Sequence, residues 1–192
     1  MPVIQASPRV YISYPDDWPS YRRETLEDRN KLLKKLGLPE RVEGNAFTPE
    51  ELRGLVCDTS GTLLDYNDRL IPGIEELLKA LREKAEFKKI EVASGGSDCL
   101  SVIGAALGKT GLVDDFIYIN GKKRGYAGTS NSTFVLEDDG ANSNTRYLLS
   151  AITPHRQVWN MGLYLPPKQY DDELIGEIVS AFSSVRTELE KL

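Results

Sequence analysis

The sequence predicts an α/β fold in which a parallel β-sheet lies between two layers of helices. From residue 54 onward, short apolar runs alternate with amphipathic segments of helical length, which is the order that βαβ units produce. The apolar runs show little polar alternation, as expected of strands that are buried on both faces. We therefore expect a three-layer domain over residues 51–192.

Composition limits the classes of protein to which the chain could belong. Its 192 residues include 40% apolar and 28% charged residues, as in soluble globular proteins, and can bury a substantial core. The net charge of −5 does not indicate a nucleic-acid-binding protein. No segment approaches the roughly 18 to 20 apolar residues that span a bilayer, and the first residues do not resemble a signal peptide. We expect a cytoplasmic protein that does not bind membranes.

Residues 1–50 differ from the rest in composition. Four prolines interrupt the first twenty residues, and a charged segment of helical character, 25–37, follows them. Thr48 and Pro49 then resemble the start of another helix. We interpret residues 1–50 as an extension that packs on the domain, or on a protein partner such as a second copy of the chain.

The elements of the domain follow from the patterning along the chain. Apolar residues at 74, 77, 78 and 81 occupy one face of a predicted helix. The paired prolines at 166 and 167 end the last apolar run. The predicted strands are 54–58, 89–94, 115–120, 132–139 and 156–166, and the predicted helices are 72–86, 97–111, 142–152 and 171–192.

Polar side chains end several of these strands. Asp58 ends the first strand, Ser94 the second, and Asp138 with Asp139 the fourth. The carboxyl ends of parallel strands gather at one edge of a sheet, where such folds bind ligands. One or two carboxylates together with a phosphate oxygen suffice to bind Mg²⁺. An aspartate there can also attack phosphorus, and backbone N–H groups of the turn 59–61 can face a phosphate.

The stretch from about residue 54 to 166 resembles the haloacid dehalogenase superfamily, whose members are Rossmann-like and mostly Mg²⁺-dependent phosphotransferases. Residues 58–63, D-T-S-G-T-L, resemble its first motif, D-x-D-G-T-[LV], and 92–97, V-A-S-G-G-S, resemble its second. The resemblance implies that Asp58, Ser60, Ser94 and Lys122 or Lys123 act in catalysis. It implies that Thr59, Gly61, Thr62, Ser94 and Gly95 bind substrate, and that Asp58, Ser60 and Asp138 or Asp139 hold Mg²⁺.

Two parts of the resemblance leave alternatives. The third-motif lysine maps to Lys122 or Lys123. The fourth motif maps either to the acidic pair at 138–139 or to D-G-A-N-S at 139–143, where Ser143 replaces the family's final aspartate. Neither position at which the family inserts a cap domain is filled. The resemblance therefore implies a large, phosphorylated substrate, or a lid supplied by residues 1–50 or by a partner.

Ser60 departs from the family motif, in which an aspartate at this position protonates the leaving group and activates water. A serine hydroxyl is too weak an acid for this task near neutral pH. Three functions remain open: a slow phosphatase or phosphotransferase, a catalytically inactive relative that binds a phosphorylated ligand or protein, and a hydrolase of the same superfamily that acts on other bonds. Threonine replaces this aspartate in P-type ATPases, whose aspartyl-phosphate is long-lived.

Overall fold

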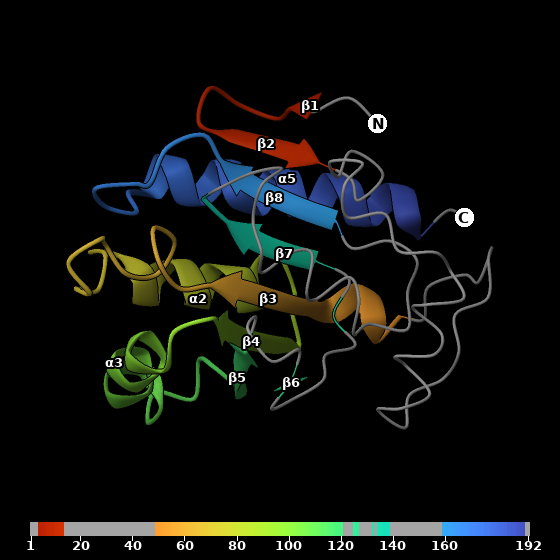
Figure 1. Cartoon of the computed structure of the whole chain (residues 1–192). Helices are drawn as coiled ribbons and strands as arrows, with labels where there is room; N and C mark the ends of the chain where they lie inside the picture. Colours follow the sequence, from red (N-terminus) through yellow and green to blue (C-terminus); the bar gives the residue numbers. More distant parts are fainter. Residues whose placement is uncertain are drawn as a thin grey trace, which may run out of the picture.

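A mixed β-sheet runs through the computed structural model, which describes residues 4–13, 49–120, 125–126, 132, 134–138 and 159–190 (Figure 1). Within these residues the strand order is β1-β2-β8-β7-β3-β4-β5-β6. The strands are β1 (Ile4–Gln5), β2 (Val10–Ser13), β3 (Gly54–Asp58), β4 (Lys89–Ser94), β5 (Asp115–Asn120), β6 (Gly125–Tyr126), β7 (Phe134–Glu137) and β8 (Trp159–Leu163).

The centre of the sheet is parallel, and its edges are antiparallel. Strands β8, β7, β3, β4 and β5 run in one direction, whereas β2 pairs antiparallel with β8, and β6 with β5. In Figure 1 the arrowheads of β3, β4, β7 and β8 point to the left and that of β2 to the right. The α/β class is thus confirmed, but the sheet is mixed, because segments outside the alternating pattern add antiparallel strands at both edges.

The predicted elements largely form where the patterning places them. The first three predicted strands have the bounds of β3, β4 and β5, and the fourth and fifth contain β7 and β8. The helices are α2 (Ile74–Glu83), α3 (Ser97–Leu107) and α5 (Asp172–Leu189). The predicted helices 25–37 and 142–152 lie outside the described residues.

Helices α2 and α5 contact each other and therefore share one face of the sheet, behind it in the view of Figure 1. The apolar positions that predicted α2 are all buried. Asp171 caps the start of α5, where its carboxylate accepts a hydrogen bond of 2.7 Å from the Leu174 amide. The prediction that helices cover both faces of the sheet stays a prediction, because the predicted helix 142–152 lies outside the described residues.

The first described residues are part of the sheet. Strand β2 pairs along its length with β8, and the ring of Tyr11 lies across Gly162, where a Cβ atom would be 1.9 Å from the ring. Arg9 joins this edge to α5 through ion pairs with Asp171 at 3.3 Å and Glu177 at 2.8 Å. Residues 14–48 of the predicted extension lie outside the described part, so its role as a lid or partner surface remains a prediction.

The helix start predicted around Thr48 and Pro49 differs from the structure. Of this stretch residues 49–53 are described, and they form the 3₁₀ helix Glu51–Arg53 just before β3 begins at Gly54. The physical reason is the apolar run that starts at Leu55, which is fully buried in the sheet and leaves no room for a longer helix.

The described helices include none that is both long and apolar enough to cross a membrane.

Candidate functional site

The carboxyl ends of three adjacent parallel strands bring together polar side chains that are far apart in sequence. Asp58 ends the central strand β3, Ser94 ends its neighbour β4, and Asp138 directly follows β7 on the other side. From β3 the chain continues to β4 on one side and later returns to β7 on the other. The chain therefore reverses its direction of progress across the sheet between β3 and β7. The crevice beyond the carboxyl ends of the strands at such a switch point is where open α/β sheets bind ligands.

A tight turn follows Asp58. The amides of Leu63 and Leu64 both donate to the Thr59 carbonyl at 2.8 Å, and the Gly61 amide donates to the Leu64 carbonyl at 2.7 Å. Gly61 adopts a φ of 77°, which favours glycine. Because the Gly61 amide bonds inside the turn, it does not face a phosphate in the way expected from the sequence.

Ser94 is fixed by two hydrogen bonds at the end of β4. Its hydroxyl oxygen accepts one from the Thr59 hydroxyl at 2.8 Å and one from the Gly96 amide at 3.1 Å. Thr59 and Ser94 are 1% and 4% exposed, so the pair is part of the interior wall of the site. A hydroxyl has two acceptor positions and one proton; both acceptor positions of Ser94 are filled, and the Cys99 thiol is a further hydrogen-bond partner of its side chain.

The Asp138 carboxylate lies against the turn after Asp58. A Cβ atom on Gly61 would be only 2.0 Å from Asp138 Oδ2, so the close approach requires glycine. The Tyr66 hydroxyl donates to the same oxygen at 3.1 Å. Asp58 and Asp138 are both half-buried, and Ser60 is exposed beside them.

Buried groups around the turn show the effect of these carboxylates. Burial and then the charge of Asp58 raise the pKa of the Cys57 thiol, which therefore stays protonated. Burial, and to a lesser extent the negative charge of Asp138, raises the pKa of Tyr170 well above its ordinary value. The Tyr170 hydroxyl donates to the Thr62 carbonyl at 2.7 Å and so holds the turn from behind.

The donor set at this edge is compatible with Mg²⁺. The described part of the chain contains no group of three or more His, Cys, Asp or Glu side chains able to hold a metal. Mg²⁺ needs fewer protein ligands, because it keeps water and takes oxygen atoms from one or two carboxylates and a phosphate. Asp58 and Asp138 supply such carboxylates from adjacent strand ends. The residues present therefore fit the ion.

The predicted site residues fall into two groups. Those of the first two motifs and Asp138 lie at this edge, with Gly95 and Ser60 on its exposed side. Lys122, Lys123 and Asp139 lie outside the described residues, so their predicted roles stay predictions. The sequence analysis missed Tyr66 and Tyr170, because no local pattern shows that their hydroxyls reach Asp138 and the Thr62 carbonyl, which are far away in sequence.

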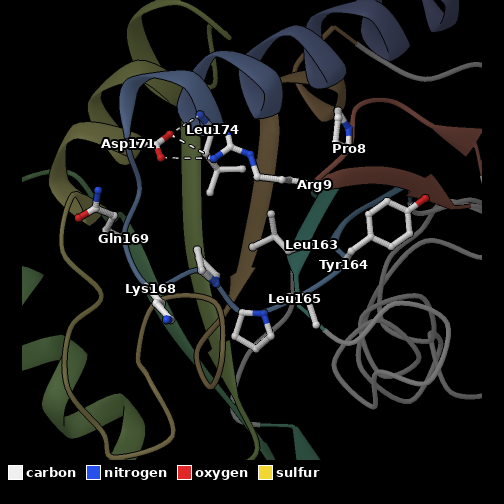
Figure 2. A pocket seen from close by; sticks show the side chains of 11 residues that line it. Pro8, Arg9, Leu163, Tyr164, Leu165, Lys168, Gln169, Asp171 and Leu174 are labelled. Carbon is white, nitrogen blue, oxygen red and sulfur yellow. Dashed lines mark hydrogen bonds and ion pairs between the residues drawn. The ribbon is translucent and has the colours of Figure 1, made fainter.

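A cavity of about 300 Å³ opens beyond the end of β8, and Figure 2 shows its lining. Its walls include the apolar side chains of Leu163, Leu165 and Leu174. In Figure 2 the Arg9 guanidinium is directed at Asp171 rather than into open space. None of the predicted site residues lines this cavity, and of its two cations, Arg9 and Lys168, Arg9 already pairs with carboxylates. We therefore assign the candidate site to the strand ends and not to the cavity.

No protein-family model, curated protein or solved structure matches the chain.

Proposed function

We propose that this protein is a Mg²⁺-dependent phosphatase or phosphotransferase of the haloacid dehalogenase type, with Asp58 as its nucleophile. One observation carries the proposal: Asp58 ends the central strand, with Ser94 and Asp138 at the ends of the two neighbouring strands. The strand order of the parallel centre, β5-β4-β3-β7-β8, has its switch point beside Asp58, in agreement with a Rossmann-like domain.

The proposed reaction has two displacements. An Asp58 carboxylate oxygen attacks phosphorus, the bond from phosphorus to the leaving oxygen breaks, and an aspartyl-phosphate forms. Water, or the hydroxyl of an acceptor, then attacks phosphorus and releases the Asp58 carboxylate. Ser94 donates a hydrogen bond to a phosphate oxygen throughout. When bound, Mg²⁺ offsets the repulsion between the carboxylates and the phosphate oxygens.

Ser60 makes the first step dependent on the leaving group of the substrate, and in the second step it leaves the attacking water to lose its proton to solvent. Its hydroxyl cannot protonate a leaving group, so the departing oxygen takes its proton from solvent. Substrates with acidic leaving groups, such as aryl phosphates, should therefore react faster than alkyl phosphates. The exposure of Ser60 leaves this side of the site open, which suits a large phosphorylated substrate.

The test compares wild type, Asp58→Asn and Ser60→Asp in hydrolysis of an aryl phosphate, with and without Mg²⁺. Wild type should turn over slowly and only with Mg²⁺, and Asp58→Asn should lower the rate by ~10³-fold or more. Ser60→Asp should raise it by about 10²- to 10⁴-fold, because a positioned acid and base is restored. Activity that survives Asp58→Asn would rule out the aspartyl-phosphate.

A catalytically inactive phosphate-binding protein is the second candidate. It is favoured by Ser60, which stands where the enzymes of the family have the aspartate that acts as acid and base. In that case Ser60→Asp would give no turnover, while wild type would still bind inorganic phosphate or a phosphorylated ligand. A calorimetric titration with inorganic phosphate, carried out beside the turnover assay of Ser60→Asp, separates the two candidates.

A further inference from the structure

The loop after the Asp58 turn is a small, internally bonded hairpin. The Asp65 amide donates to the Arg69 carbonyl at 2.8 Å, and Leu64 pairs antiparallel with Leu70. The Asp65 carboxylate accepts hydrogen bonds from the amides of Asn67 at 2.8 Å and Arg69 at 2.9 Å. These bonds lower the pKa of Asp65, the one from Arg69 most, and hold the hairpin in one shape.

The hairpin reaches the strand ends at two points. At one, the Tyr66 hydroxyl donates to Asp138 Oδ2 at 3.1 Å. At the other, the Cys99 thiol, in the first turn of α3, lies 3.6 Å from Asp68 Oδ1. One contact joins the hairpin to the residue after β7 and the other joins it to α3, which packs on β4 and β5, so the hairpin is held at the carboxyl ends of the strands.

Tyr66 contributes little to the core. It is 72% exposed, so it buries little apolar surface compared with Tyr11 and Tyr170, which are 6% and 4% exposed. The feature that distinguishes Tyr66 is therefore the bond of its hydroxyl to a carboxylate at the candidate metal site. The same carboxylate packs against Gly61 of the turn, where a Cβ atom would overlap it.

We propose that Tyr66 is a positioning residue that orients the Asp138 carboxylate for Mg²⁺ and thereby sets the affinity of the site for the ion. This inference rests on the proposed function only in that Asp138 is taken as a metal ligand. Groups that hydrogen-bond to ligating carboxylates typically change metal affinity by about 10- to 100-fold when removed. The rate of the chemical steps is not part of the inference.

The experiment is a Mg²⁺ titration of wild type, Tyr66→Phe and Tyr164→Phe by calorimetry, with no substrate present. Phenylalanine keeps the ring and removes the hydroxyl. Tyr164 is a matched control, because it is also exposed, at 45%, and packs on Tyr11 away from Asp138. Tyr66→Phe should weaken Mg²⁺ binding by about 10-fold or more, whereas Tyr164→Phe should leave the affinity unchanged.

Melting temperature separates positioning from a general structural effect. Because Mg²⁺ stabilises only the state that binds it, the rise in Tm on adding Mg²⁺ should shrink in Tyr66→Phe while the metal-free Tm stays near that of wild type. If Tyr66→Phe lowered Tm equally with and without Mg²⁺ and left the Mg²⁺ affinity unchanged, the inference about Tyr66 would be overturned while the proposed function would stand. Absence of Mg²⁺ binding in wild type would overturn both the inference and the metal-dependent function proposed above.

Discussion

The two ends of the central strands bury polar groups in different ways. At the amino ends, Arg186 of α5 is 4% exposed and donates from two of its nitrogens to the carbonyls of Leu52, at 2.8 Å, and Ala85. Its guanidinium lies 4.5 Å from the centre of the Phe87 ring. Phe87, Phe134 and Phe182 pack edge to face, with ring centres 5.0 to 5.7 Å apart. Here a cation is enclosed by aromatic rings and fixed to the backbone.

At the carboxyl ends the two carboxylates and Tyr66 remain accessible, although the Thr59 and Ser94 hydroxyls are buried. The hydroxyls of Thr59 and Ser94 bond to each other, the carboxylates of Asp58 and Asp138 are half-buried, and Tyr66 is largely exposed. The difference indicates that the amino end joins α5 to the sheet, whereas the carboxyl end has polar groups able to meet a ligand. Substitutions at the two ends should therefore separate stability from ligand binding.

The largest expected effect is at the amino end. Phe182→Ala should lower the free energy of unfolding by about 3–5 kcal/mol, because it removes a fully buried ring from the aromatic cluster. Urea unfolding of the two proteins measures the loss. Phe182→Leu keeps much of the volume and should cost clearly less. Equal costs for both substitutions would contradict the account of this end as a packed core.

Arg186→Met tests the buried cation. Methionine keeps the aliphatic volume but leaves the Leu52 and Ala85 carbonyls without their donor, for which we expect a loss of about 2 kcal/mol. Burial lowers the pKa of Arg186 to about 10, so the side chain is charged at neutral pH, and part of this cost is offset by relief from burying the charge. If Arg186→Met were more stable than wild type, the cost of burying the charge would exceed the stabilisation from the two hydrogen bonds. Mg²⁺ affinity should not change.

Two glycines with left-handed backbone form a matched pair for the carboxyl end. Gly61 and Gly73 have φ of 77° and 85°, and a Cβ on either would lie about as close to an oxygen, 2.0 Å from the Asp138 carboxylate or 2.2 Å from the Tyr170 carbonyl. Each alanine substitution should cost roughly 1–2 kcal/mol of stability. Only Gly61→Ala should also weaken Mg²⁺ binding in a calorimetric titration. Loss of binding in both variants would indicate a global effect instead.

The smallest effect concerns the acid stability of the Arg9 cluster. The hydrogen bond from Arg9 lowers the pKa of Glu177 below its ordinary value of 4.5. As the pH falls, Glu177 is therefore protonated in the unfolded chain before it is protonated in the folded one. The contribution of the Arg9–Glu177 pair to stability is complete well above pH 4.5 and is lost as the pH falls through the lower folded pKa. Glu177→Gln should lose less stability than wild type between about pH 5 and 3, by under about 1 kcal/mol. Arg9→Gln should also reduce the loss of stability over this pH range. Adding Glu177→Gln to Arg9→Gln should reduce it no further.

Much of the fold could be predicted from local pattern. Strand and helix positions followed from residues close together in sequence, since burial imposes a period of 3.6 on a helix face and continuous apolar runs on central strands. The same reasoning located Asp58 and Ser94 at strand ends. It could not predict that β2 pairs with β8, because that pairing depends on a contact between residues about 150 positions apart, such as Tyr11 with Gly162.

The sequence by itself determined which residues end the strands and that Ser60 replaces a carboxylate. Only the tertiary structure decided what surrounds them: the sheet order puts β4 and β7 on opposite sides of Asp58, the turn uses the Gly61 amide internally, and Tyr66 bonds to Asp138 across 72 positions of sequence. The physical reason is that hydrogen bonds of this kind depend on distances of about 3 Å between side chains, which strand order and backbone turns fix and local composition does not.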